Sequence, residues 1–156
     1  MFGFFNKKKL ETYAPIAGKI IDITEVPDQV FSSKMMGDGF AIEPEADVVV
    51  APCDGTVALV AATKHAVAIE SQGVQILIHI GLDTVELQGQ GFTAHVQEND
   101  TVKKGDPLIT FDRGYIVAQE KPLTTIVVIT NMDEKVKKIE KNLADCKGPI
   151  LAIEVK

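Results

Sequence analysis

Short runs of apolar, β-branched residues recur along this chain of 156 residues, and they constrain its fold more than any other sequence feature. Glycine, proline, aspartate or asparagine interrupts most of the gaps between them. Short strands at such spacing are typical of a β-sandwich or β-barrel. We therefore predict an all-β, antiparallel sandwich or barrel with strands at residues 16–23, 40–43, 48–50, 56–61, 65–70, 74–80, 84–87, 108–111, 123–130 and 150–155.

Helices and repeats add little to this pattern. Only residues 115–120 and 133–143 have a helical composition, so we expect at most two short helices. The second segment begins with carboxylates and has lysines in its later turns, as a helix dipole favours. A faint internal pseudo-repeat relates residues 14–20 to residues 51–57, which share the pattern Ala-Pro-x-x-Gly-x-(Ile/Val). In each copy a rigid proline precedes a glycine turn, and a predicted strand follows.

Length, composition and charge exclude several classes of protein. The chain is long enough for one domain with its own core, and 46% hydrophobic with 24% charged residues is typical of soluble globular proteins. It has neither an apolar run of about 18 residues, as a membrane span needs, nor a visible secretory signal. We therefore expect a cytoplasmic protein with reduced thiols. A net charge of −6 disfavours nucleic acid as a partner, because nucleic acid needs a basic face.

The first residues of the chain differ from the rest. Three phenylalanines and three lysines stand within the first ten residues, a composition that permits at most peripheral contact with anionic lipid. Because chain ends are usually mobile, we expect a mobile leader over residues 1–12 and a single β domain over residues 13–156.

Two histidines flank one predicted β-hairpin. Residues 65–70 and 74–80 form its arms, and Ser71-Gln72-Gly73 is expected to be a three-residue loop whose glycine supplies a positive φ. This register places His65 directly opposite His79, with Cβ atoms roughly 4.5–5.5 Å apart on one face. A two-residue loop would shift the register by one and separate the rings. Because sites gather where strands run into loops, the pair is a candidate functional site.

Two other classes of function fit parts of the sequence. A zinc-dependent hydrolase would use His79 and Asp83, with His65 or His95 as a third ligand. Zinc peptidases with related sandwich folds use a His-x-His pair, which this sequence lacks. A biotin- or lipoyl-like swinging-arm carrier would present a lysine at a hairpin tip, and Lys34-Met35-Met36 is the nearest approach, in the wrong order.

Taken together, these motifs resemble the glucose-class IIA component of the bacterial phosphoenolpyruvate-dependent sugar phosphotransferase system. The resemblance covers nearly the whole chain, and residues 78–87, Ile-His-Ile-Gly-Leu-Asp-Thr-Val-Glu-Leu, are its most specific part. Supporting segments are residues 26–28, 30–31, 36–39, 64–65, 69–71, 89–92, 105–106 and 129–133. The resemblance implies one IIA β-sandwich domain that acts as a phosphocarrier. It would accept a phosphoryl group from phosphorylated HPr and pass it to a IIB cysteine of a glucose-type permease, driving sugar uptake by group translocation.

The same resemblance implies a role for each site residue. His79 would take the phosphoryl group on Nε2, and His65 would stabilise that group by donating a hydrogen bond to its oxygens. Thr63 would orient His65, and the carbonyl of Gly81 would hold the Nδ1–H of His79. Only the acceptor nitrogen of a neutral imidazole is a nucleophile, so the Gly81 contact would leave Nε2 able to attack.

Other residues are expected to bind partners. Asp28 and Asp83 resemble acids that meet an arginine of the donor. Val30, Phe31 and Met36 would form an apolar rim, although from sequence alone plain core packing suits them as well. No cofactor is expected to be required. The two imidazoles would bind Zn²⁺ only where a partner supplies further ligands, and regulatory targets are a further class of partner.

Overall fold

A computed structural model describes residues 8–144 and 147–156 of the chain. In chain order the elements within these ranges are β1 (Lys8–Tyr13), β2 (Gly18–Asp22), the 3-10 turn η2 (Ile23–Glu25), α1 (Gln29–Ser32), β3 (Asp38–Pro44), β4 (Val48–Val50), β5 (Gly55–Val60), β6 (Ala66–Ser71), β7 (Val74–Ile80), the 3-10 turn η3 (Thr84–Leu87), β8 (Phe92–Ala94), β9 (Thr101–Val102), β10 (Pro107–Phe111), α2 (Arg113–Ala118), β11 (Thr125–Ile129), α3 (Met132–Lys135), β12 (Val136–Lys141) and β13 (Pro149–Val155).

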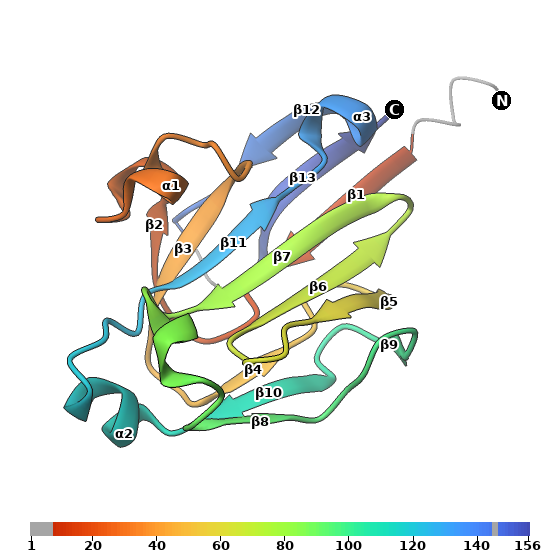
Figure 1. Cartoon of the computed structure of the whole chain (residues 1–156). Helices are drawn as coiled ribbons and strands as arrows, with labels where there is room; N and C mark the ends of the chain where they lie inside the picture. The colour runs from red at the N-terminus through yellow and green to blue at the C-terminus, as the bar shows by residue number, and fades with distance from the viewer. Residues whose placement is uncertain (1–7, 145–146) are drawn as a thin grey trace, which may run out of the picture.

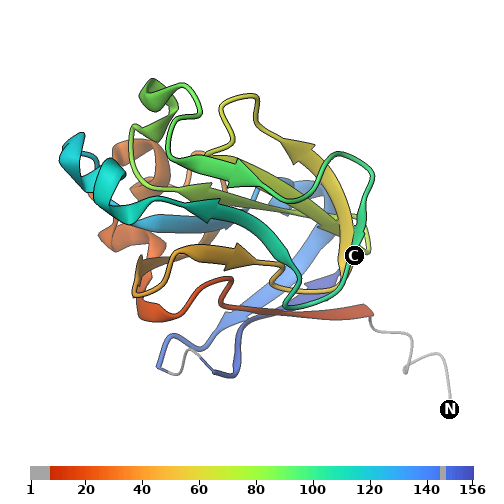
Figure 2. The ribbon, with the colours of Figure 1, turned by 90° about the horizontal axis from the view of Figure 1, so that it is seen from below.

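The strands form three antiparallel sheets. The largest has the order β2-β3-β11-β7-β6-β5-β9, and two smaller sheets have the orders β4-β10-β8 and β1-β13-β12. All three contribute side chains to one main core, so the fold is a sandwich with the large sheet as one layer (Figures 1 and 2). The short helices α1 and α2 lie at the margin of the sheets (Figure 1). The predicted fold class is confirmed.

The alternation of side chains along β7 decides which face carries the site. Val74, Ile76, Ile78 and Ile80 are buried in the main core. His79 therefore points to the opposite face of the large sheet, because successive side chains of a strand alternate between faces. A smaller apolar cluster covers that face beneath η2 and α1, and its buried members are Ile23, Val26, Phe31, Ala41, Leu82, Ile126 and Val128.

The two copies of the predicted pseudo-repeat have comparable structures, because each one leads into a strand. The strands are β2 and β5, both of which belong to the large sheet. The glycine of each copy starts its strand in close contact with a neighbour: a Cβ on Gly18 would collide with the carbonyl of Glu43, and one on Gly55 with that of Glu70. Close backbone approach therefore requires glycine in both copies.

Two predicted elements are wrong. Residues 84–87 form the turn η3 instead of a strand, because Asp83 and Gln88 adopt left-handed backbone conformations at its two ends. The expected helix at residues 133–143 is the four-residue α3 followed by β12. Pairing of β12 with β13 packs Val136 and Ile139 against the main core, so tertiary packing overrides local helix preference there. With α1 and α3, the described residues hold three short α-helices, one more than expected.

Part of the predicted leader is an ordered strand. Residues 1–7 lie outside the described ranges, whereas residues 8–12 belong to β1, which pairs with β13. Leu10, opposite Ile153, is buried in the main core, and this burial explains the order of the segment. Within residues 8–144 and 147–156, no helix is both long and apolar enough to span a membrane.

Candidate functional site

His79 is the second-to-last residue of β7. In the large sheet it lies between Ala66 of β6 and Ile126 of β11. Its Nδ1 lies 2.8 Å from the carbonyl oxygen of Gly81. Because a carbonyl oxygen only accepts hydrogen bonds, Nδ1 must carry the proton when the ring is neutral. The lone pair of the ring is then on Nε2. This contact fixes the tautomer of His79.

The two histidine rings are adjacent, but the hairpin register that brings them together differs from the predicted register. The hairpin loop has two residues, Gln72 (φ 51°) and Gly73 (φ 84°), and the register pairs His79 with Ala66. The expected three-residue loop is therefore wrong. The rings nevertheless lie edge to face with centroids 4.8 Å apart. His65 precedes the regular strand, after Lys64 with φ 59°, so it need not follow the alternation of β6.

Thr63 anchors the second ring. Its Oγ1 lies 2.7 Å from Nδ1 of His65, and the His65 residue is only 7% exposed. If the hydroxyl donates, Nδ1 is the acceptor and Nε2 of His65 carries the proton. Within the described residues, the hydroxyl of Thr12 is the sole buried side-chain polar atom without a hydrogen bond. The Nε2 atoms of both histidines have no protein hydrogen bond there, and neither atom is completely buried.

Both imidazoles are held neutral near pH 7. Burial, with a further contribution from the nearby His79, lowers the pKa of His65 to about 4. Burial also lowers the pKa of His79, although the Gly81 carbonyl and the charges of Asp28 and Asp83 oppose this shift. Neutral His79 has the nucleophilic lone pair that its cationic form lacks.

Two acids lie near His79 at the starts of two short helical turns. Asp28 is the N-cap of α1, where its Oδ1 accepts the backbone N–H of Val30 at 3.0 Å. Asp83 is exposed, has φ 58° and precedes η3. Both raise the pKa of His79 through their charge, so both lie within electrostatic reach of its ring. The sequence-predicted acids therefore gather at the histidine pair.

The three predicted rim residues differ in exposure. Phe31 is 5% exposed, belongs to the small cluster beneath α1, and places its ring centroid 5.1 Å from that of His79. It is therefore packed as core while contacting the site. Val30 and Met36 are 45% and 38% exposed. Val85 of η3, within the distinctive segment 78–87, is a further exposed apolar residue, at 51%.

The residues proposed for the two alternative functions do not form the sites that those functions need. Within the described ranges, no three His, Cys, Asp or Glu side chains are placed to hold a metal ion. His95 follows β8 in another sheet, and its Nε2 contacts Oγ1 of Thr110 at 2.6 Å. Lys34 follows α1, away from any hairpin tip, and its Nζ lies 3.7 Å from a carboxylate oxygen of Asp38.

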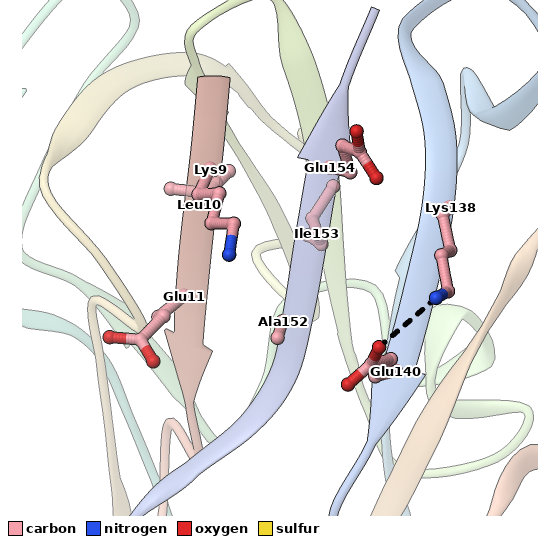
Figure 3. A pocket seen from close by; sticks show the side chains of 8 residues that line it. All are labelled: Lys9, Leu10, Glu11, Lys138, Glu140, Ala152, Ile153 and Glu154. Atoms are coloured by element: carbon pink, nitrogen blue, oxygen red, sulfur yellow. Dashed lines mark ion pairs between the residues drawn. The ribbon is translucent and has the colours of Figure 1, made fainter. Parts of the chain in front are cut away.

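A depression elsewhere on the surface is a separate feature. Charged side chains of β1, β12 and β13 surround Ala152 on the outer face of their sheet (Figure 3). Lys138 and Glu140 form an ion pair of 3.3 Å across part of it. The residues that line it include neither His65 nor His79, so the depression is separate from the histidine pair.

Comparison with known proteins yields one family. A model of the family "phosphoenolpyruvate-dependent sugar phosphotransferase system, EIIA 1" matches residues 10–135. A glucose-specific EIIA component of Halalkalibacterium halodurans is 47% identical over 143 residues, which cover 86% of this chain and 83% of that protein. The structure of glucose permease IIA from Mycoplasma capricolum superimposes with a TM-score of 0.81 at 38% identity, covering 99% of this chain and 98% of that chain.

Some relatives are much longer than this chain. A glucose-specific EIICBA component of Staphylococcus carnosus is 50% identical over 128 residues, which cover 81% of this chain but 19% of that protein. The chain thus spans about a fifth of such relatives. None of these similarities supports a hydrolase or a swinging-arm carrier.

Proposed function

Because the chain belongs to the EIIA 1 family of the phosphoenolpyruvate-dependent sugar phosphotransferase system and is a phosphocarrier of that system, we propose that it carries the phosphoryl group on Nε2 of His79. One observation carries this assignment: the hydrogen bond from Nδ1 of His79 to the Gly81 carbonyl, at 2.8 Å, places the lone pair on Nε2. The ring of His79 lies beside a second imidazole, with centroids 4.8 Å apart, and within electrostatic reach of Asp28 and Asp83.

The transfer step follows from this geometry. The lone pair of Nε2 forms a bond to phosphorus while the bond between phosphorus and the donor breaks, and its electron pair returns to the donor. Nδ1 keeps its proton throughout and donates it in a hydrogen bond to the Gly81 carbonyl. Charge spreads over the peripheral phosphoryl oxygens in such a transfer, so alignment and electrostatic stabilisation supply most of the catalysis.

His65 is suited to stabilise the transferred group. Thr63 donates to its Nδ1 in the proposed state, so its Nε2–H is available to a phosphoryl oxygen. The ring is neutral before transfer, and arrival of a dianion beside it raises its pKa and favours the cation. A protonated His65 would then form a charge-assisted hydrogen bond, which is stronger than a neutral one.

Asp28 and Asp83 require a cationic partner. Two carboxylates beside His79 repel a phosphoryl dianion, so this chain alone does not favour the phosphorylated state electrostatically. A donor or acceptor that brings an arginine offsets that repulsion and completes the site only when docked. We infer that the exposed apolar residues Val30, Met36 and Val85 contact the same partner around the ring.

The donor in this proposal is phosphorylated HPr, and the acceptor is a IIB cysteine, whose thiolate attacks phosphorus and returns the electron pair to Nε2. The EIICBA relative supports the acceptor, because its name joins A, B and C units in one chain. Names of several relatives support glucose or a similar sugar as the transported molecule. A cytoplasmic location follows from these partners. Zn²⁺ would bind only where a partner adds ligands to the two imidazoles.

The test is incubation with phosphoenolpyruvate, enzyme I and HPr, followed by location of the phosphate by peptide mass spectrometry. We expect one acid-labile, base-stable phosphate on His79. Label on His65 or on a serine contradicts the assignment, and omission of HPr from the mixture is the control for the donor.

A further inference from the structure

The backbone turn that follows His79 carries the carbonyl that fixes its tautomer, and this turn is tightly enclosed. Gly81 has φ 77°, a conformation that favours glycine. A Cβ added to Gly81 would lie 2.5 Å from Cγ2 of Thr84 and 2.8 Å from the carbonyl oxygen of Pro122. The direction of the Gly81 carbonyl is therefore set by what packs on both sides of the turn.

Thr84 lies beside Gly81 on the buried side of this turn. It is fully buried, and its Oγ1 donates to the carbonyl of Ile80 at 2.5 Å. The backbone N–H of Leu82 donates to the Pro122 carbonyl at 3.2 Å and ties the same turn to the segment before β11. Two hydrogen bonds and one methyl contact thus hold residues 80–84 in place.

Ile80 links the supports of the two histidines. Its N–H donates to the carbonyl of His65 at 2.8 Å, and its own carbonyl accepts from Thr84. Adjacent peptide groups thus connect the backbone of one ring to the turn that orients the other. Thr84 is thus connected through Ile80 to the backbone of His65 and to the turn that follows His79.

We propose that Thr84 is a positioning residue whose hydroxyl holds the Gly81 carbonyl against Nδ1 of His79 and thereby selects the nucleophilic tautomer. Its consequence for phosphoryl transfer rests on the proposed function, whereas its effect on the tautomer does not. Which imidazole nitrogen carries the proton is set by the hydrogen bond offered to the ring. When the hydroxyl is lost, the turn loosens, the Nδ1 contact weakens and protonation on Nε2 becomes competitive.

The test compares the full-length protein with its Thr84→Val and Thr84→Ser variants. Valine replaces the hydroxyl by a methyl group at similar volume, and serine keeps the hydroxyl. Two-bond ¹H–¹⁵N correlation spectra of histidine-labelled protein at pH 7.5 report which nitrogen of His79 is protonated. Initial rates of phosphoryl uptake from phosphorylated HPr are measured on the same samples.

We expect protonation on Nδ1 in the unchanged protein and in Thr84→Ser. In Thr84→Val the Nε2–H tautomer should become detectable, and uptake should slow about three- to tenfold, as loss of one hydrogen bond predicts. Thr125→Val is the matched control, because Thr125 is also fully buried but donates to the carbonyl of Leu123 at 3.0 Å. It should keep the original tautomer despite a comparable loss of stability.

If Thr84→Val does not fold, Thr84→Cys replaces it and is compared with Thr84→Ser, because the two side chains are alike in shape and the thiol is the weaker donor. An unchanged tautomer in the folded hydroxyl-free variant overturns the proposal, whatever the uptake rate. A tautomer shift confined to that variant supports it, even if phosphate in the unchanged protein is found away from His79, a result that refutes only the proposed function.

Discussion

The rings of His65 and His79 lie edge to face with centroids 4.8 Å apart, and a hydrogen bond to Nδ1 anchors each ring. The two anchors differ in kind. The carbonyl of Gly81 can only accept, whereas the hydroxyl of Thr63 can donate or accept. One ring is therefore locked as a nucleophile, and the other can change its protonation state while keeping its anchor.

This difference predicts separate defects for the two histidines. His79→Gln removes the nucleophile, so phosphoryl uptake from HPr should fall to background. His65→Gln leaves the nucleophile and still offers an amide donor, so uptake should persist in part. Passage of the group to the IIB cysteine should slow by roughly a hundredfold, because the proton-dependent stabilisation by His65 is lost.

Rapid mixing of each half-reaction separately measures both effects. Circular dichroism of each variant controls for folding. Equal loss of uptake in the two variants would show that His65 is indispensable to the first transfer and that this division of roles is wrong.

Burial of neutral His65 also predicts a pH dependence of stability. Its pKa is lowered to about 4 in the folded protein, against an ordinary value near 6.5. Between these values the unfolded chain binds the proton and the folded chain does not. The free energy of unfolding should therefore fall as pH drops from about 6.5 to about 4, by at most about 3 kcal/mol from this residue.

Urea unfolding at several pH values across that window measures the slope. His79 acts in the same direction, since burial lowers its pKa too. His65→Gln should reduce the slope without removing it. A His65→Gln variant with the original slope would show that His65 does not titrate in this range.

Exposed apolar residues near His79 predict a docking defect. Val30→Lys places a charge in the proposed contact surface, and we expect affinity for HPr to fall about tenfold with little change in stability. Val117→Lys is the matched control, because Val117 is 57% exposed and Val30 is 45% exposed, but Val117 lies on α2, whose Ile116 packs into the main core on the other side of the large sheet. Titration calorimetry measures both. Equal affinities for the two variants would place the docking surface elsewhere.

The unpaired hydroxyl of Thr12 predicts a stabilising substitution. Thr12 is fully buried, and its Oγ1 has no hydrogen bond among the described residues. Thr12→Val removes an unsatisfied polar atom at similar volume, so the free energy of unfolding should rise by about 1 kcal/mol. Thr125→Val, which breaks an existing hydrogen bond, should lower it by a similar amount. Denaturant unfolding of both variants measures the two signs, and a loss of stability in Thr12→Val would contradict this account.

The sequence was most informative where local pattern and tertiary environment agree. The strands at residues 48–50 and 74–80 have the predicted bounds, because apolar, β-branched runs are buried there. Residues 136–141 mislead, since their lysines and glutamate suit an exposed helix as well as the outer face of a strand. Only pairing with β13, which lies elsewhere in the sequence, selects the strand.

The contacts of the two histidines were predictable, and the register that brings the rings together was not. Family resemblance pointed to Thr63 and Gly81, and both lie within hydrogen-bond distance of their histidines. The hairpin register was wrong because Gln72 adopts a positive φ, which few non-glycine residues do. The burial of Phe31 was equally hidden, since one helical turn does not reveal which of its apolar residues faces the sheet.

In the phosphorylated protein, phosphorus is expected to be bonded to Nε2 of His79, while Nδ1 keeps its proton and donates it in a hydrogen bond to the Gly81 carbonyl. Phosphorylation of ¹⁵N-histidine-labelled protein, followed by measurement of one-bond ¹⁵N–³¹P coupling, tests it directly. We predict coupling to Nε2 of His79 and a retained proton on its Nδ1. Coupling to Nδ1 of His79, or to either nitrogen of His65, would refute this assignment.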